Sequence, residues 1–486
     1  MKPLRLLIFL ILAVLLLAPG AGWMAPGSAA LDFAALDTTI TAQMAKHGLK
    51  GVSLAITQGE ETLYLKSYGT AGQGRPLTPQ TPMFIGSQSK SFTALAIAQL
   101  AEQGLVDVNA PVRTYLPWFA VADEAASAQI TVAHLLHHTS GLSDAGFLTI
   151  LPEDASIEDA VRALKTAQLT APLGARQQYF NLGYVALAGI VETVSGQSYA
   201  DYIQQHIFDP LQMTHTYTDP ALAKQNGLSQ GYSCFFGFTV AARQPAPTYE
   251  LAAGYIISTA EDMAHFAIAM NNNGVYAGTR VLSVPWMREL FKPVLGYGMG
   301  WFVTPGHIYH GGANDTFKTF VDLYPDRGLG IVLLINEGYM IDHFISAGQL
   351  FAGVEALVLG NPPPAVSAGW SVRVIGWGLL ALVLALCTLH AWNISHLRGW
   401  RERARQWSPL KRAWDVAISF IIPTVILIVV FTQIKAFWGD RFNLTYQLRV
   451  MARTLTDISI LMIVGSVPDY AQGLVKLFWA LRKTTR

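Results

Sequence analysis

The sequence has few charged residues, only two cysteines and no surplus of basic side chains. Charged residues make up 13% of the 486 residues and hydrophobic residues 52%, whereas the charged share of an ordinary globular domain is about twice as large. A formal net charge of +1 provides no basic surface that could follow phosphates, so no nucleic-acid partner is expected. The apolar excess is concentrated in a few segments, which indicate a membrane protein.

The first 30 residues have the layout of a secretory signal peptide. Lys2 and Arg5 precede an unbroken apolar run over residues 6–18, and small residues follow up to Ala30. Because this run is short for a membrane span, we predict a signal peptide at residues 1–30, with an uncleaved N-terminal anchor as the alternative. Both interpretations place the residues that follow outside the cytoplasm.

Long apolar segments return after a proline-rich linker at residues 361–368. Residues 369–486 are predicted to form a membrane domain of about three helices. The helices are expected at about residues 371–392, 414–436 and 455–480. Two aspartates and a proline interrupt the third segment.

The basic residues around these segments set their orientation. The loop between the first two helices contains one acidic residue, Glu402, and six basic ones: Arg398, Arg401, Arg403, Arg405, Lys411 and Arg412. By the positive-inside rule, this loop and the basic C-terminal tail lie in the cytoplasm, and residues 31–360 lie outside it. Cys234 and Cys387 then belong to different parts of the molecule, so no intramolecular disulfide is expected.

The predicted extracytoplasmic domain has strand-like patterns at its beginning and end and a helical middle. A helical pattern at 32–47 precedes a β-hairpin at 51–71, and four strand-like runs at 297–336 precede a helix at 342–359. We predict an α/β fold in which both ends of the domain build one antiparallel sheet, flanked by helices. A mainly helical insertion occupies about residues 105–290.

Ser87 and Lys90 lie one helical turn apart at the start of a predicted helix. A serine in the first turn of a helix is favoured as a nucleophile because the local field stabilises a developing anion. A buried lysine beside it can be neutral and accept the serine proton. Spacing alone is not specific, since Ser408 and Lys411 have the same spacing in the predicted cytoplasmic loop.

The context of this pair is more specific. The segment "FIGSQSKSFTALAIAQLAEQG" resembles the nucleophile segment of serine β-lactamases and penicillin-binding proteins, especially the class C β-lactamase-related branch. That family carries S-x-x-K, then Y-x-N, then K-T-G or H-x-G on a late strand. Tyr179 and Asn181 supply the second motif, and "YHGG" at 309–312 resembles the third. The resemblance covers roughly residues 33–358 and implies the β-lactamase/transpeptidase-like fold.

The resemblance also implies roles for the motif residues. Ser87 would be acylated, Lys90 would activate it, and Tyr179 would pass a proton to the leaving group. Asn181 would hold a substrate amide, and His310 would offer a donor or partial positive charge near Tyr179. The remaining implied positions are Gly311 and Gly312, which leave room for substrate, and Ala313, whose N–H would complete an oxyanion hole with that of Ser87.

Other interpretations of these residues compete with catalysis. Taken singly, Ser87 could be a helix cap, Tyr179 a packed aromatic and His310 a strand histidine, and only their combination favours an active site. The histidines of "HLLHHTSGL" could suggest a metal. No carboxylate follows them in the H-E-x-x-H manner, so neither a metal nor another cofactor is expected. The absence of G-x-S-x-G in the sequence argues against an α/β-hydrolase.

Together these features predict a multi-pass protein of the bacterial cytoplasmic (inner) membrane with a periplasmic serine hydrolase or peptidase domain. Its partners would be membrane lipid and a small acylated peptide, amino-acid amide or ester that forms an acyl-enzyme. The layout resembles that of prodrug-activating peptidases such as the colibactin-maturing peptidase, which implies an N-acyl-D-amino-acid substrate. A cell-wall D,D-peptidase, an esterase and a non-catalytic penicillin-binding sensor are the alternatives, and the oligomeric state is left open.

Overall fold

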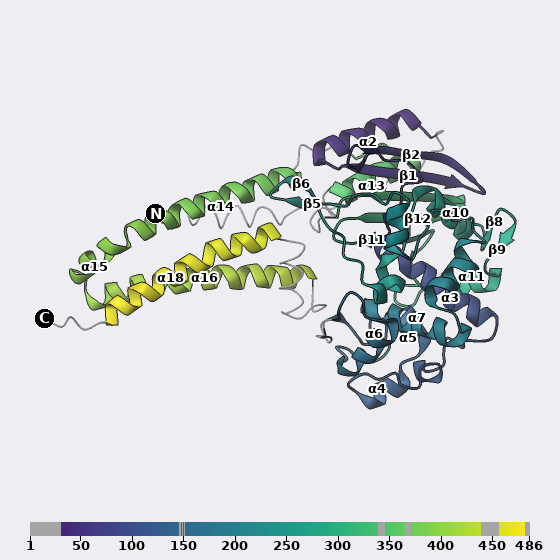
Figure 1. The fold of residues 1–486 in the computed structure, drawn as a ribbon, viewed down its shortest axis with the longest axis horizontal. Coiled ribbons are helices and arrows are strands. Elements are labelled where there is room, and N and C mark those ends of the chain that lie inside the picture. Colours follow the sequence, from purple (N-terminus) through teal and green to yellow (C-terminus); the bar gives the residue numbers. More distant parts are fainter. Residues whose placement is uncertain are drawn as a thin grey trace.

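The computed structural model describes residues 31–144, 147, 149, 151–338, 346–364, 371–438 and 456–481. The predicted signal peptide at 1–30 lies outside the described residues, as do the end of the predicted linker and the last residues of the chain. In Figure 1 the helices and strands up to α13 form one domain, and three long helices extend away from it.

A seven-stranded antiparallel sheet forms the centre of the domain, in the order β10-β11-β12-β13-β1-β2-β3. Its strands are β1 (Gly51–Gln58), β2 (Glu61–Gly72), β3 (Arg75–Pro76), β10 (Phe302–Thr304), β11 (His307–Ala313), β12 (Lys318–Tyr324) and β13 (Leu329–Ile335). The first strand pairs directly with the last, Val52 facing Ile335. The prediction that both ends of the domain build one sheet is therefore confirmed.

Both faces of this sheet are covered by helices. In β1, Val52, Leu54 and Ile56 contribute to the core shared with α2 (Phe33–His47) and α13 (Gly348–Val358). Ala55, between them, belongs to the core on the opposite face, which includes residues of α10 (Ala260–Asn271). Because side chains alternate along a strand, a central strand covered on both faces buries nearly all of its residues, as β1 does from Gly51 to Thr57.

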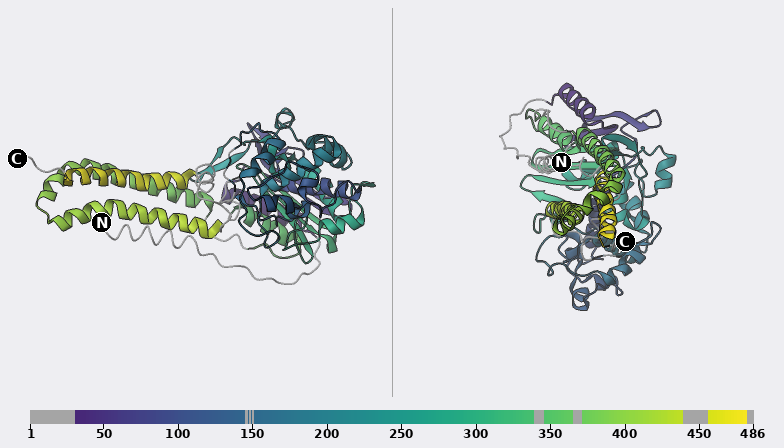
Figure 2. Two further views of the ribbon diagram at one scale, coloured as in Figure 1. Left: turned by 90° about the horizontal axis from the view of Figure 1, so that it is seen from below. Right: turned by 90° about the vertical axis from the view of Figure 1, so that its left-hand side faces the viewer.

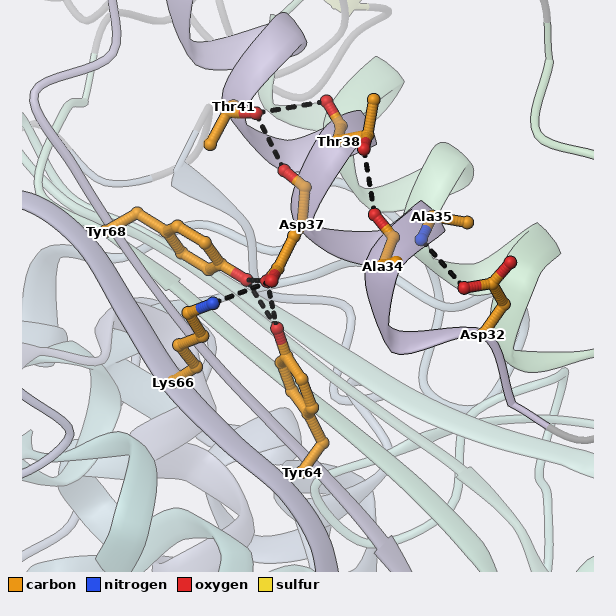
Figure 3. A network of polar contacts seen from close by, with 9 residues as sticks. All are labelled: Asp32, Ala34, Ala35, Asp37, Thr38, Thr41, Tyr64, Lys66 and Tyr68. Atoms are coloured by element: carbon orange, nitrogen blue, oxygen red, sulfur yellow. Dashed lines mark hydrogen bonds and ion pairs between the residues drawn. The ribbon is translucent and has the colours of Figure 1, made fainter.

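Helix α2 is held to the sheet by the carboxylate of Asp37 (Figure 3). The helix begins where Asp32 accepts a hydrogen bond from the Ala35 N–H. One turn later, Asp37 accepts hydrogen bonds from the Tyr64 and Tyr68 hydroxyls and pairs with Lys66 at 2.7 Å. The hydrogen bond from Lys66, followed by those of the two tyrosines, lowers the pKa of Asp37 to about 2. The carboxylate thus stays charged and keeps α2 docked on β2.

The stretch between β3 and β10, which includes the predicted insertion at about residues 105–290, is mainly helical, as predicted, but it also contains short strand pairs that the sequence patterns did not reveal. Its helices are α3 (Ser89–Glu102), α4 (Glu124–Gln129), α5 (Val132–Leu136), α6 (Ile157–Ala163), α7 (Asn181–Ser195), α8 (Tyr199–Ile203), α9 (Pro220–Gln225), α10 and α11 (Val284–Leu290). The strand pairs are β4 (Met83–Phe84) with β7 (Ile257–Ser258), β5 (Tyr232–Phe235) with β6 (Phe238–Ala241), and β8 (Val275–Tyr276) with β9 (Thr279–Arg280).

Three helices beyond the domain are long and apolar enough to cross a membrane. They are α14 (Val372–Ser395), α16 (Pro409–Trp438) and α18 (Thr456–Leu481), and the basic helix α15 (Leu397–Arg405) connects the first two. Figures 1 and 2 show them side by side as a bundle. Helix α18 continues through Pro468, so the interruptions in its sequence do not break it. Lys476 of α18 pairs with Asp415 of α16 at 2.9 Å.

Candidate active site

Ser87 lies in a tight helical turn, η1 (Gly86–Gln88), directly before α3. Gly86 has a φ of +56°, in the left-handed region that favours glycine. The hydroxyl of Ser89 donates to the Gly86 carbonyl at 2.8 Å and accepts from the Ile256 N–H at 3.1 Å. Every residue of α3 from Ser89 to Ala101 is buried, so the helix is a rigid support for Ser87.

Lys90 is completely buried and its amine is surrounded by oxygen atoms from three separate segments. Nζ lies 3.3 Å from Ser87 Oγ, 2.8 Å from Asn181 Oδ1 and 2.5 Å from the carbonyl oxygen of Ala253. The last residue belongs to η7 (Leu251–Tyr255), a turn packed against α3 and α7. Of the expected residues, the structure thus brings Ser87, Lys90 and Asn181 into direct contact.

Burial lowers the pKa of Lys90 to about 7, although the charges of Glu250 and Asp144 oppose the shift. A neutral amine has two N–H groups and one lone pair. The oxygens of Asn181 and Ala253 can only accept, so they use both N–H groups. The lone pair is then left for the hydroxyl hydrogen of Ser87, which is the arrangement a general base requires.

Tyr179 lies directly before α7, with its ring 4.7 Å from Lys90 Nζ. Burial raises the pKa of the Tyr179 hydroxyl, and the proximity of Ser87 opposes this only in part. Among the described residues the hydroxyl has no hydrogen-bond partner of acceptable geometry. Tyr179 is therefore a protonated phenol close to Lys90 that can donate a proton to a bound group.

His310 lies near Tyr179, with ring centroids 6.4 Å apart, but its ring carries no charge. Burial lowers the pKa of this histidine to about 3, so the ring is neutral. Nδ1 lies 2.8 Å from the carbonyl oxygen of Gly311, which can only accept, so Nδ1 carries the hydrogen. Nε2 then accepts from the Tyr297 hydroxyl at 3.1 Å. The expected positive charge near Tyr179 is absent, and His310 instead fixes the Tyr297 side chain.

Two glycines bring the nucleophile turn against the end of β11. A methyl group added to Gly86 would lie 2.4 Å from the Ala313 nitrogen, and one on Gly312 would lie 1.8 Å from the Ile85 carbonyl oxygen. The space at Gly312 is therefore filled by the neighbouring backbone and not left for substrate. This contact places the Ser87 and Ala313 backbones beside one another, as the predicted oxyanion hole requires.

His138 is a site residue whose role the sequence did not reveal. Its carbonyl accepts from the Gln178 N–H at 2.6 Å, and its Nδ1 accepts from the Phe180 N–H at 3.2 Å. Its ring packs against that of Tyr179 with centroids 4.3 Å apart. His138 thus holds the residue before Tyr179, the residue after it and the ring itself. Its φ of +57° marks a backbone conformation that few residues adopt, although histidine does so more often than most.

The charges of two carboxyl groups, those of Asp144 and Glu250, also act on the residues of the site. Burial and then the charge of Glu250 raise the pKa of Asp144 to about 7, and Lys90 opposes the shift. Asp144 in turn raises the pKa of both Lys90 and Tyr179. The charge of Asp144 therefore affects both proton-transfer groups.

Clusters that could ligate a metal lie away from Ser87 in the described part of the chain. They are His215 with Glu261 and Asp262, and His307 with Asp322 and Glu355. The histidines of "HLLHHTSGL" do not form such a cluster: His134 caps α5 and His137 bonds the Tyr297 carbonyl.

A buried lysine beside a serine and a protonated tyrosine is the arrangement found in serine hydrolases of the serine–lysine class. The sequence model described as Beta-lactamase matches residues 36–350. The chain therefore belongs to the beta-lactamase family, together with the penicillin-binding-protein-like serine hydrolases.

Similarity to individual proteins supports this assignment. Protein flp of Staphylococcus aureus (strain MW2) is 28% identical over 318 residues, and the match spans 62% of this chain and 62% of flp. PbpX of Bacillus subtilis (strain 168), named provisionally as a penicillin-binding protein, is 30% identical over 300 residues, which are 60% of this chain and 71% of PbpX. The octameric penicillin-binding protein homologue of Pyrococcus abyssi matches with a TM-score of 0.60 and 25% identity, over 72% of this chain and 81% of that one.

The contacts of His138 predict that replacing it slows the hydrolysis of amides more than that of activated esters. We expect His138→Ala to misplace Tyr179 and to slow amide hydrolysis roughly tenfold to a hundredfold. An activated ester, whose leaving group needs no proton, should lose much less. The measurement is the ratio of kcat for an amide to kcat for an activated ester. His138→Asn keeps an acceptor and tolerates the backbone conformation, so it should restore part of the lost amide activity. The control is His134→Ala; a loss equal for amide and ester would contradict the positioning role.

Proposed function

We propose that the protein is a membrane-anchored serine hydrolase that cleaves amides or esters through an acyl-enzyme on Ser87. The observation that carries the proposal is the buried Lys90 amine, whose lone pair is available to Ser87. Lys90 Nζ lies 3.3 Å from Ser87 Oγ and combines a pKa near neutrality with a lone pair that its other two partners do not use. The Tyr179 phenol holds its proton, and Nε2 of the neutral His310 already accepts from Tyr297.

Acylation follows from these contacts. Ser87 Oγ attacks the substrate carbonyl carbon while its proton passes to Lys90 Nζ, 3.3 Å away. The carbonyl oxygen becomes an oxyanion, which the N–H groups of Ser87 and Ala313 stabilise. Tyr179 gives its proton to the departing nitrogen or oxygen, and the new phenolate recovers a proton from the Lys90 ammonium, 4.7 Å from its ring. Water then attacks the ester by the same steps in reverse, which frees the acid and Ser87.

We propose N-acyl-D-amino-acid amides as the substrate class, because the arrangement of an exported hydrolase domain followed by three helices resembles that of prodrug-activating peptidases. Asn181 supports an amide substrate: its Oδ1 accepts from Lys90 Nζ at 2.8 Å, which leaves its NH2 group to donate to a substrate carbonyl. The similarity to PbpX and to the P. abyssi penicillin-binding protein homologue supports a D,D-peptidase as the second candidate. A panel of N-acylated D- and L-amino-acid amides with varied acyl length distinguishes the two.

The proposed nucleophile predicts a specific loss. Ser87→Ala should lower kcat at least about a thousandfold, because the covalent route is removed. Ser408→Ala, in the second S-x-x-K of the chain, is the matched control and should keep full activity. Mass spectrometry of the wild type with a slow ester substrate should detect the acyl group on Ser87. Equal turnover by wild type and Ser87→Ala would contradict the proposal, and a stable acyl-enzyme without turnover would indicate a sensor.

The pKa of Lys90 predicts the pH dependence of acylation. The amine is a base only when deprotonated, so kcat/KM should rise about tenfold per pH unit below pH 7 and level off above it. Because Asp144 raises the pKa of Lys90, Asp144→Asn should move the midpoint to lower pH. If Asp144→Asn removes the rise altogether, the titrating group is the Asp144 carboxyl and the assignment to Lys90 is wrong.

We further propose that the domain lies outside the cytoplasm, with α15 inside. Four arginines in α15, Arg398, Arg401, Arg403 and Arg405, support this orientation by the positive-inside rule. A reporter that is active only in the cytoplasm should be active when fused after Arg405 and inactive when fused after Gly360. The opposite result would reverse the orientation.

A further inference from the structure

The β5–β6 hairpin is an apolar element on the surface of the domain. Residues 231–242 contain no charged side chain and three phenylalanines. Phe238 is 53% exposed, Val240 39% and Phe235 38%. A two-stranded hairpin that faces water usually carries polar or charged residues at such positions, because exposed strands with apolar side chains promote aggregation. The composition of this hairpin therefore indicates a covering partner.

The hairpin is firmly attached to the domain at its base. The Tyr232 N–H donates to the Asn336 carbonyl at 2.9 Å, and the Gly338 N–H donates to the Tyr232 carbonyl at 2.9 Å. Its turn, Phe236–Gly237, has positive φ angles at both residues, which suits a two-residue hairpin loop. The exposed side chains are thus held in place by a defined hairpin.

The tip of the hairpin rests on the first turns of α14, and in Figure 1 the hairpin lies where α14 meets the domain. A methyl group on Gly376 would lie 2.0 Å from the Gly237 nitrogen, so the two backbones touch. The Phe238 ring lies 6.4 Å from that of Trp377, which is itself 44% exposed. Arg373 lies at the same level, with its guanidinium 5.3 Å from the Trp377 ring.

The contact between the hairpin and α14 indicates that the partner covering the hairpin is the lipid bilayer. Helix α14 is one of the three candidate membrane spans, so its first turns would lie at the lipid–water boundary. Aromatic side chains and arginine are the residues that favour this layer, where apolar rings reach the acyl chains and the charge reaches the headgroups. The exposed rings of the hairpin lie beside them.

We propose that the β5–β6 hairpin and the first turns of α14 together insert into the interfacial layer of the bilayer and hold the catalytic domain against the membrane surface. The inference rests on the proposed placement of α14 in the membrane. Beyond β6 the chain continues to Gln244, whose Oε1 accepts from the Thr316 N–H at 3.1 Å and hydroxyl at 2.8 Å. Thr316 lies three residues after Ala313. The hairpin therefore also links Ala313, which belongs to the proposed oxyanion hole, to the membrane surface.

The test measures the depth of single labels in the full chain. Cys387 is replaced by alanine, Cys234 is buried and stays, and an environment-sensitive fluorophore is attached to Phe238→Cys in nanodiscs of phosphatidylcholine and phosphatidylglycerol. The lipids carry a nitroxide either near the beginning or near the end of the acyl chain. We expect the Phe238 label to lose at least roughly a third of its intensity with the shallow nitroxide and less with the deep one, as for a side chain at the acyl boundary.

Two further positions separate the possible outcomes. Leu384, in the middle of α14, should be quenched more by the deep nitroxide, and an unquenched Leu384 label means that the membrane placement itself is wrong. Leu63 is 39% exposed, as Val240 is, but lies on the β1–β2 hairpin and should not be quenched. If the Leu384 label is quenched and the Phe238 label is not, the hairpin inference is overturned. Self-quenching between Phe238 labels would also overturn it, because the hairpin would then contact a second copy of the protein. Val240→Cys repeats the measurement should Phe238→Cys fail to fold.

Discussion

The burial of the Lys90 amine is the constraint on which the site depends. Removing a charged ammonium from water is costly, and the neutral form avoids most of that cost. The carbonyl of Ala253 and the amide of Asn181 bind the remaining N–H groups, so a buried neutral amine is stable. These partners come from η7 and from the first residue of α7. The helical insertion is therefore part of the chemistry, because it supplies both acceptors.

A second constraint is the lack of side chains at two points of contact. Gly86 and Gly312 allow the nucleophile turn and strand β11 to touch through their backbones. The Ser87 and Ala313 N–H groups can then face one substrate oxygen. Rigid backbone dipoles stabilise charge well because they need no reorganisation during the reaction, and α3, which is buried along most of its length, keeps the turn in place.

The sequence predicted those parts of the site and fold that have local signatures. Helical and strand periodicity revealed α2, α3 and the terminal strands, and the resemblance to the family motifs identified Ser87, Lys90, Tyr179, Asn181 and His310. The structure brings Ser87, Asn181 and the Tyr179 ring close to the Lys90 amine. Other features had no such signature. The Ala253 carbonyl is a backbone atom that any residue could provide. His138 acts through a left-handed backbone conformation, and the charge state of His310 depends on burial. For the β5–β6 hairpin, the uncharged run around Phe238 is the sequence feature from which it could have been predicted.

The pairing of β1 with β13 has a consequence for the order in which the domain folds. The sheet joins residues near the beginning of the domain to residues near its end, and contacts between such distant segments form late in folding. Strand β11, which carries Gly312 and Ala313, is joined to β1 in the sheet through β12 and β13. A nascent chain that has not yet delivered β13 holds Ser87 and Lys90 without their partner strand. Assembly of the site around Ser87 therefore depends on completion of the whole domain.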